Sequence, residues 1–274
     1  MYIVRLSMTT RLLALLLTGT AEAALAASSW DRVMLTDAAA KQGAVCLDGS
    51  PGGYFIQRGD PKRWILFMQG GGWCSSADDC AARAFGAPGK PGHPWLGGSR
   101  AWPRTYVDLY EGSQLFAAPG FRNFTIVFAP YCDGGSWSGD AAAPVPTAVN
   151  GTSIGKPIYY RGKRLLDALL DSVLAAGMAN ASNLLWGGCS AGGLTTYLHA
   201  DYVKSRAAPG TRVLALADAM YSLQHEPFTP PIPPARTFID DMRWGYSAWN
   251  ASGGIDADCL AHYGQVRYSL RAPV

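Results

Sequence analysis

The stretch Gly188-Cys189-Ser190-Ala191-Gly192 follows a strand-like run from Asn183 to Trp186 and decides how the rest of the chain is interpreted. A G-x-S-x-G pattern after a strand is typical of a nucleophile elbow, because small residues permit the sharp turn from strand to helix that exposes the serine hydroxyl. A helix is predicted after the turn, over residues 194–205. We therefore predict that Ser190 is a catalytic nucleophile. The alternative is a chance match, since the chain has 32 glycines.

A second glycine cluster, Gly70-Gly71-Gly72-Trp73, directly follows the apolar run from Trp64 to Met68. A tetrahedral oxyanion needs backbone N–H groups aimed at it, and glycines let the main chain approach a substrate without obstruction by side chains. We predict an oxyanion hole made by the amide of Gly70 or Gly71 together with the amide of Ala191. The alternative is an ordinary glycine turn at the end of a strand. The presence of the elbow favours the oxyanion hole.

The composition sets limits on the class of protein. A chain of 274 residues, of which 49% are hydrophobic and 16% charged, can bury a full core as one domain. The net charge of +3 and the lack of a long basic run argue against a nucleic-acid partner, because phosphate binding needs clustered Lys and Arg. The 4 His and 6 Cys residues show no C-x-x-C or H-E-x-x-H spacing. We predict neither a metal nor a cofactor.

The N-terminus has the features of a secretory signal. Arg5 and Arg11 supply positive charge, Leu12 to Leu17 form a short apolar core, and small residues follow. This apolar stretch is far shorter than the roughly 20 residues that span a bilayer. We predict a signal peptide over residues 1–26 and one domain over residues 27–274. The protein is thus expected to be secreted, to the cell wall or medium, or to the periplasm of a Gram-negative bacterium.

Export to an oxidising compartment makes the cysteines candidates for disulfides. Cys74 and Cys80 flank a polar turn after the glycine cluster, so we predict a bridge between them. Cys46 and Cys132 are plausible partners, although the sequence alone cannot fix the connectivity. Cys189 lies in the elbow and is expected to be a buried thiol.

Strands and helices alternate along the chain. The predicted strands are residues 54–57, 64–68, 125–129, 183–186 and 212–217, and the predicted helices are residues 159–176, 194–205 and 240–244. This alternation predicts an α/β protein with a mainly parallel sheet and helices on both faces.

Several motifs occur in an order that is specific to one family. They are residues 44–50, 69–74, 131–139, 188–193 and 217–219. The chain resembles the pectin acetylesterase and Notum family of secreted serine carboxylesterases from about residue 44 to residue 259. This resemblance implies an α/β-hydrolase fold. It also implies that acyl esters, such as acetyl groups on pectic or related polysaccharide, are hydrolysed through an acyl-enzyme.

The resemblance also implies a Ser-His-Asp triad whose serine is Ser190. The histidine would deprotonate the hydroxyl and then protonate the leaving alkoxide, and the aspartate would orient the imidazole. Trp73, Tyr131 and Trp137 are predicted to line the mouth of the site, with core or loop packing as the alternative. Asp218 is predicted to be a structural or pocket carboxylate.

The triad acid and base of the family lie beyond the region that corresponds to residue 259, and this sequence ends at Val274. The last strands of the fold are therefore predicted to be missing. His199 lies about 13 Å along its helix from Ser190 and cannot reach it. His93, His225 and His262 are expected to be surface residues.

Two functions from different classes follow from these observations. The first is a secreted carboxylesterase whose sequence is incomplete, acting on an acylated polysaccharide or another ester as a monomer. The second is an inactive fragment or a non-catalytic secreted binding module that uses the same cleft. The missing triad partners motivate the second function.

Overall fold

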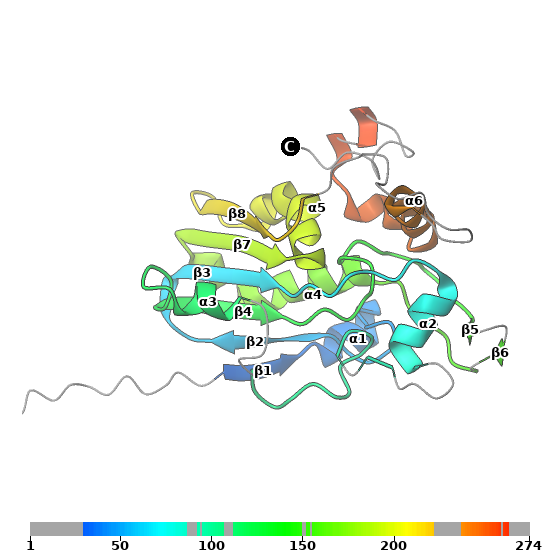
Figure 1. Ribbon diagram of the computed structural model, residues 1–274. Helices are drawn as coiled ribbons and strands as arrows, with labels where there is room; N and C mark the ends of the chain where they lie inside the picture. The colour runs from blue at the N-terminus through cyan, green and yellow to red at the C-terminus, as the bar shows by residue number, and fades with distance from the viewer. Residues whose placement is uncertain are drawn as a thin grey trace, which may run out of the picture.

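The computed structural model describes residues 30–86, 92–93, 95–106, 112–149, 152–153, 155–221, 237–258 and 260–262. Its main sheet has six strands in the order β1-β2-β4-β3-β7-β8 (Figure 1). These strands are β1 (Trp30–Met34), β2 (Gly53–Gln57), β3 (Asp60–Met68), β4 (Phe124–Ala129), β7 (Asn183–Cys189) and β8 (Arg212–Asp218). The short strands β5 (Ala148–Val149) and β6 (Thr152–Ser153) pair with each other away from this sheet (Figure 1).

Six α-helices connect and cover the strands. They are α1 (Thr36–Gln42), α2 (Ala77–Phe85), α3 (Ser113–Ala117), α4 (Gly162–Ala175), α5 (Ala191–Arg206) and α6 (Phe238–Ala248), all within the described ranges. Two 3₁₀ helices, η1 (Met178–Asn180) and η2 (Ala251–Gly254), complete the described elements.

The centre of the sheet is parallel, as predicted. β3 pairs in parallel with both β4 and β7, and β7 pairs in parallel with β8. β2 is antiparallel to β1 and to β4. The carboxyl ends of β3, β4, β7 and β8 therefore lie at one edge of the sheet, where the glycine cluster and the elbow begin.

Hydrophobic side chains pack on both faces of this sheet. Leu66, Val127 and Trp186 belong to a buried cluster that includes the apolar stripe of α4. On the opposite face, Phe67 and Phe128 pack with Phe116 of α3. Side chains of one strand alternate between the two faces, so the uninterrupted apolar run of β3 is buried on both sides. The prediction of helices on both faces is confirmed.

The predicted strands occur at their expected places, but several elements were not predicted from the sequence. β1 carries Asp31 and Arg32 in its middle, and both are exposed because β1 is an outer strand. α1, α2 and α3 are too short or too polar to show a clear apolar period. The helix after the elbow starts earlier than predicted, directly after Ser190.

Two disulfides join cysteines of the described ranges, and both pairings agree with the predictions. Cys74 is bonded to Cys80, and Cys46 is bonded to Cys132. The second bridge joins the segment before β2 to the segment after β4. Cys189 belongs to neither bridge and is half-buried, so the expectation of a buried thiol is corrected. The reason is that Cys189 lies at the border of the hydrophobic cluster on the α3 face of the sheet, which α3 covers only in part.

Some predictions concern residues outside the described ranges. These are the signal peptide over residues 1–26, His225 and the closing residues after 262. Within the described part of the chain, no helix has the length and apolar character needed to cross a membrane.

Candidate active site

Ser190 occupies a strained turn between β7 and α5. Its backbone has φ 54° and ψ −117°, a conformation that a residue with a side chain seldom adopts. Its N–H donates to the carbonyl oxygen of Asp218 at 2.9 Å, and its own carbonyl oxygen accepts the N–H of Leu194 at 3.0 Å. The side chain is half-buried. This is the strand-to-helix geometry expected of a nucleophile elbow.

Glycines at both sides of Ser190 allow this turn to lie against the end of β3. A Cβ atom built on Gly192 would lie 2.0 Å from the carbonyl oxygen of Met68. A Cβ atom on Gly188 would lie 2.6 Å from the same oxygen. The small residues of the motif are thus required by a close approach of two backbones, which brings the start of α5 next to the segment after β3.

Gly192→Ala is expected to lower the free energy of unfolding by about 3 kcal/mol, because the added methyl group meets backbone atoms that cannot rotate away. Urea unfolding followed by circular dichroism measures this change. Gly253→Ala is the matched control, since nothing lies within 4 Å of a Cβ atom at that position. Equal stability of the two variants would contradict the close packing of the elbow.

The glycine cluster leaves β3 in an irregular backbone path. Gly71 and Gly72 have φ values of 139° and 63°, which favour glycine. Gln69 fixes the start of this path, because its side-chain oxygen accepts the N–H of Tyr131 at 3.0 Å. Ala191 is buried as the first residue of α5, so its N–H is one of the helix N-terminal amides that lack a helical acceptor. The oxyanion roles of Gly70, Gly71 and Ala191 stay predictions.

Arg83 of α2 forms a hydrogen bond with the backbone of the glycine cluster. Its Nη1 donates to the carbonyl oxygen of Gly71 at 2.9 Å, and its guanidinium lies 5.9 Å from the ring centroid of Tyr131. The disulfide between Cys74 and Cys80 ties α2 to the end of the cluster. The orientation of the peptide between residues 71 and 72 is therefore set in part by Arg83. The role of Arg83 is not predicted from the sequence, because nothing in the sequence places α2 beside the glycine cluster.

Arg83→Met keeps most of the side-chain volume and removes the donor to Gly71. We expect the rate at which a fluorophosphonate labels the protein to fall about tenfold, since a charge-assisted hydrogen bond contributes roughly 1.5–3 kcal/mol. Arg122→Met, at an exposed arginine, is the matched control. An unchanged labelling rate in Arg83→Met would show that the glycine cluster does not depend on Arg83.

The three aromatic residues predicted at the mouth of the site have different environments. Trp73 is half-buried, and its ring meets Phe238 of α6 edge-on at 5.6 Å. Tyr131 and Trp137 are 0% and 2% exposed and belong to the hydrophobic core. The prediction that these two side chains face an open mouth is corrected, because the loop that carries them folds inward. Trp73 alone keeps a partly accessible ring.

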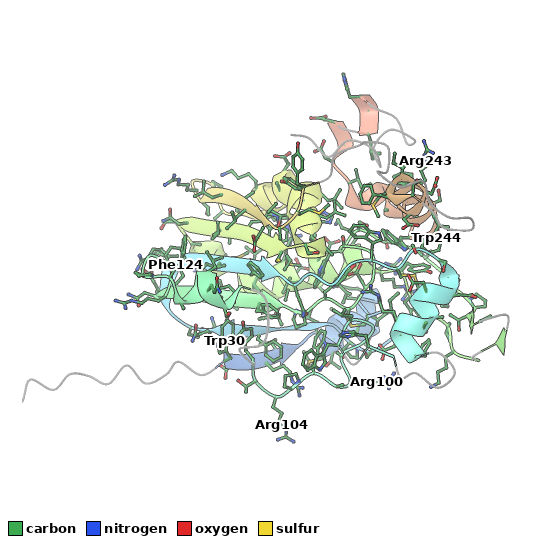
Figure 2. The ribbon with its side chains drawn as sticks, in the orientation of Figure 1. Trp30, Arg100, Arg104, Phe124, Arg243 and Trp244 are labelled. Carbon is green, nitrogen blue, oxygen red and sulfur yellow. A yellow bond between two sulfur atoms is a disulfide. The ribbon has the colours of Figure 1, made fainter. Side chains whose placement is uncertain are left out.

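Helix α6 packs its aromatic side chains against the segments around Trp73. Trp244 lies on the side of α6 that faces the body of the protein, whereas Arg243 points away from it (Figure 2). The Trp244 ring contacts the rings of Tyr160 and Trp249 edge-on, at 6.4 and 6.2 Å. The contact between Trp73 and Phe238 therefore belongs to a larger aromatic packing between α6 and the segments around the glycine cluster.

A buried carboxyl group organises the loop after β4. Asp133 is 1% exposed, and its Oδ2 accepts the N–H groups of Gly135 and Trp137 at 3.1 and 3.0 Å. Within the described residues its Oδ1 has no hydrogen-bond partner. Burial raises the pKa of Asp133 to about 7, although the two N–H donors oppose this change. Asp133 lies within the family motif over residues 131–139, but no role is predicted for it from the sequence.

His199 is a structural residue of α5, in line with the prediction that it cannot reach Ser190. Its Nε2 lies 3.1 Å from the carbonyl oxygen of Trp137, and the side chain is 1% exposed. Burial lowers the pKa of His199 to about 3, so the imidazole is neutral at physiological pH. Another histidine, His93, accepts the N–H groups of Trp95 and Leu96 on its Nδ1.

Asp218 lies at the carboxyl end of β8 and is exposed. Its carboxylate borders a cavity of about 470 Å³, and the other lining residues are Phe67, Gly112, Ser113, Gln114, Leu115 and Leu216. This cavity lies on the α3 face of the sheet. The pocket role predicted for Asp218 agrees with this position and stays a prediction.

Comparisons with known proteins agree with this architecture. The family described as Pectinacetylesterase matches residues 25–240. Pectin acetylesterase 11 of Arabidopsis thaliana is 32% identical over 197 residues, which cover 70% of this chain and 46% of that protein. Pectin acetylesterase 5 of the same plant is 30% identical over 236 residues, or 84% of this chain and 50% of that protein.

More distant similarity extends to animal proteins. Human palmitoleoyl-protein carboxylesterase NOTUM is 30% identical over 190 residues, which cover 67% of this chain and 35% of that protein. The solved structure of the Wnt deacylase Notum from Drosophila superposes with a TM-score of 0.70 at 22% identity, covering 88% of this chain and 66% of that one. This likeness confirms the α/β-hydrolase-like fold. The chain spans about half the length of the plant relatives that it matches.

Proposed function

Because the chain belongs to the pectinacetylesterase family, we propose that it is a carboxylesterase that removes acyl groups, foremost acetyl groups, from a pectic or related polysaccharide. The observation that carries this proposal is the strained Ser190 turn, packed against the segment that follows β3. The curated plant relatives are named pectin acetylesterases, which supports the acetyl ester as substrate.

In the proposed reaction, the Ser190 Oγ attacks the ester carbonyl carbon while its proton passes to a general base. The resulting oxyanion accepts hydrogen bonds from the amides of Ala191 and of Gly70 or Gly71. The sugar alkoxide then leaves with a proton, and water hydrolyses the acyl-serine to release the carboxylic acid. His93 accepts backbone N–H groups of its own loop and the Nε2 of His199 lies against the carbonyl oxygen of Trp137, so neither of these two histidines is assigned the role of base.

The proposed location is outside the cytoplasm. Residues 1–26 are proposed as a signal peptide and residues 27–274 as one esterase domain. The two disulfides support this proposal, because disulfides form and persist in oxidising compartments. A secreted enzyme would also meet its polysaccharide substrate in the cell wall.

Labelling with a tagged fluorophosphonate tests the serine chemistry, because stable modification needs an activated hydroxyl. We expect the label on the peptide that contains Ser190. Acetate release from acetylated pectin, compared with acetylated xylan, tests the substrate. A chain that folds but takes up no label would contradict the esterase proposal, whereas labelling without release of acetate from pectin would contradict only the substrate.

A further inference from the structure

The hydrogen-bond ladder between β3 and β4 continues beyond the two strands through a side chain. The strands end side by side, with Met68 opposite Ala129 (Figure 1). The N–H of Gln69 donates to the carbonyl oxygen of Ala129 at 3.0 Å. In a regular parallel ladder, the main-chain carbonyl oxygen of Gln69 would accept the next N–H of the neighbouring strand, which is that of Tyr131. Tyr131 instead donates to the side-chain oxygen Oε1 of Gln69, at 3.0 Å.

This exchange of acceptors releases the main-chain carbonyl of Gln69 from the sheet. Its oxygen lies 3.0 Å from the point that a Cβ atom on Gly192 would occupy, which places it beside the first turn of α5. The carbonyl of Gln69 and the N–H of Gly70 belong to one planar peptide, so the direction of the first fixes the direction of the second. The side chain of Gln69 therefore sets the orientation of the peptide at which the glycine cluster begins.

The hydrogen bond between Gln69 and Tyr131 is buried. The two residues are 8% and 0% exposed. An N–H group needs an acceptor opposite it, so the atom of the Gln69 amide that faces Tyr131 is the oxygen. A buried N–H without a partner is costly. Loss of the side-chain acceptor would thus draw the N–H of Tyr131 back to the main-chain carbonyl of residue 69 and turn the peptide away from α5.

The loop after β4 supports this contact and is held together by its own hydrogen bonds. The hydroxyl of Tyr131 accepts the N–H of Ser136 at 3.0 Å. The same loop binds the far end of the glycine cluster, since the N–H of Cys74 donates to the carbonyl oxygen of Gly134 at 3.0 Å. The cluster is therefore fixed to one loop at both ends, through the backbone of Cys74 and through the side chain of Gln69.

We propose that Gln69 is a positioning residue of the esterase site. Its side-chain amide takes the place of a main-chain acceptor and so turns the first peptide of the glycine cluster into the orientation that the oxyanion hole requires. This inference rests on the proposed esterase function. Preorganised N–H donors stabilise an oxyanion only when they are aimed at it, so the rotation of one peptide is expected to slow acylation of Ser190.

Gln69→Met tests the proposal, because it keeps the length of the side chain and removes the oxygen acceptor. We expect the rate of fluorophosphonate labelling at Ser190 to fall about a hundredfold, as for the loss of one oxyanion-hole donor. In the hydrolysis of p-nitrophenyl acetate, kcat and kcat/KM should fall by the same factor, since the lost interaction belongs to the transition state. Gln69→Glu keeps an oxygen acceptor at this position and should restore most of the labelling rate.

Two control variants separate positioning from a loss of stability. Gln42→Met makes the same chemical change at an exposed glutamine, the last residue of α1. Thr211→Val removes a buried hydrogen bond, 2.8 Å long, from Thr211 to the carbonyl oxygen of Ala181, directly before β8. Both controls should be labelled at the rate of the wild type. Circular dichroism shows whether each variant is folded.

Crystal structures of the wild type and of Gln69→Met give a measurement that does not depend on activity. We expect the N–H of Tyr131 to bond to the main-chain carbonyl of residue 69 in the variant only. The wild-type structure tests the side-chain hydrogen bond even where a variant does not fold.

Three results would overturn the proposal. The first is a wild-type crystal structure in which Tyr131 already bonds to the main-chain carbonyl of Gln69. The second is a labelling rate of Gln69→Met equal to that of the wild type, and the third is an equal loss in Thr211→Val, which would assign the effect to stability. A folded wild type that takes up no label contradicts the esterase proposal instead, and the two crystal structures then decide whether Gln69 orients the peptide.

Discussion

Ser190→Ala is expected to reduce fluorophosphonate labelling from close to one phosphonate per chain to none. The rate of p-nitrophenyl acetate hydrolysis is expected to fall at least about a thousandfold below that of an active wild type. The reason is chemical: alanine has no nucleophile, while the backbone turn and the neighbouring amides stay in place. Relief of the strained backbone at residue 190 is not expected, because alanine also carries a Cβ atom. The free energy of unfolding should therefore change little.

Intact-protein mass spectrometry gives the labelling stoichiometry, and the release of p-nitrophenol gives the rate. Ser247→Ala is the matched control, since Ser247 is an exposed serine on α6 and no catalytic role is predicted for it. Its labelling should equal that of the wild type. Persistent labelling of Ser190→Ala, or equal rates of ester hydrolysis in both variants, would assign the chemistry to a different residue.

Asp133→Asn is expected to remove a large dependence of stability on pH. The pKa of Asp133 is raised from 3.8 in the unfolded chain to about 7 in the folded chain, with burial as the main cause. Between these values the unfolded chain has lost this proton and the folded chain retains it. The free energy of unfolding therefore falls as the pH rises from about 4 to about 7, by about 4 kcal/mol in total.

The asparagine variant resembles the protonated acid in shape, and its Oδ1 can still accept the N–H groups of Gly135 and Trp137. We expect Asp133→Asn to gain about 4 kcal/mol relative to the wild type between pH 4 and pH 8. Urea unfolding at several pH values measures this difference. Asp201→Asn, at an exposed carboxylate on α5, controls for the loss of one carboxyl group. A constant difference between wild type and Asp133→Asn across this range would contradict the buried neutral acid.

The parts of the fold that could be predicted from the sequence are those in which the packing of the folded protein requires a recognisable local pattern of residue types. The apolar run of β3 and the G-x-S-x-G turn after β7 both need particular residue types at each position, so they are visible without a structure. β1 was missed because an outer strand tolerates charged residues such as Asp31 and Arg32 on its exposed positions. Its pairing with β2 depends on tertiary contacts alone.

The same distinction applies to the candidate site. Ser190 and the glycines are fixed by backbone geometry, which leaves a trace in the sequence as small residues at set spacing. Arg83 acts through a contact between α2 and the glycine cluster, and a single arginine in a short helix forms no sequence pattern that predicts this contact. Tyr131 and Trp137 were placed at an open mouth because aromatic residues near a site often line it, but the hydrogen bonds of Asp133 and His199 hold their loop in the core.

The bridge between Cys46 and Cys132 spans 86 residues of the sequence, including β2, β3 and the glycine cluster. A protease that cuts the chain once inside this span would leave both pieces covalently attached. Such a nicked protein would migrate as one band on a non-reducing gel and as two bands after treatment with dithiothreitol. In an environment rich in proteases, Ser190 and the glycine cluster would thus remain on one molecule after a cut that would divide a chain without this disulfide.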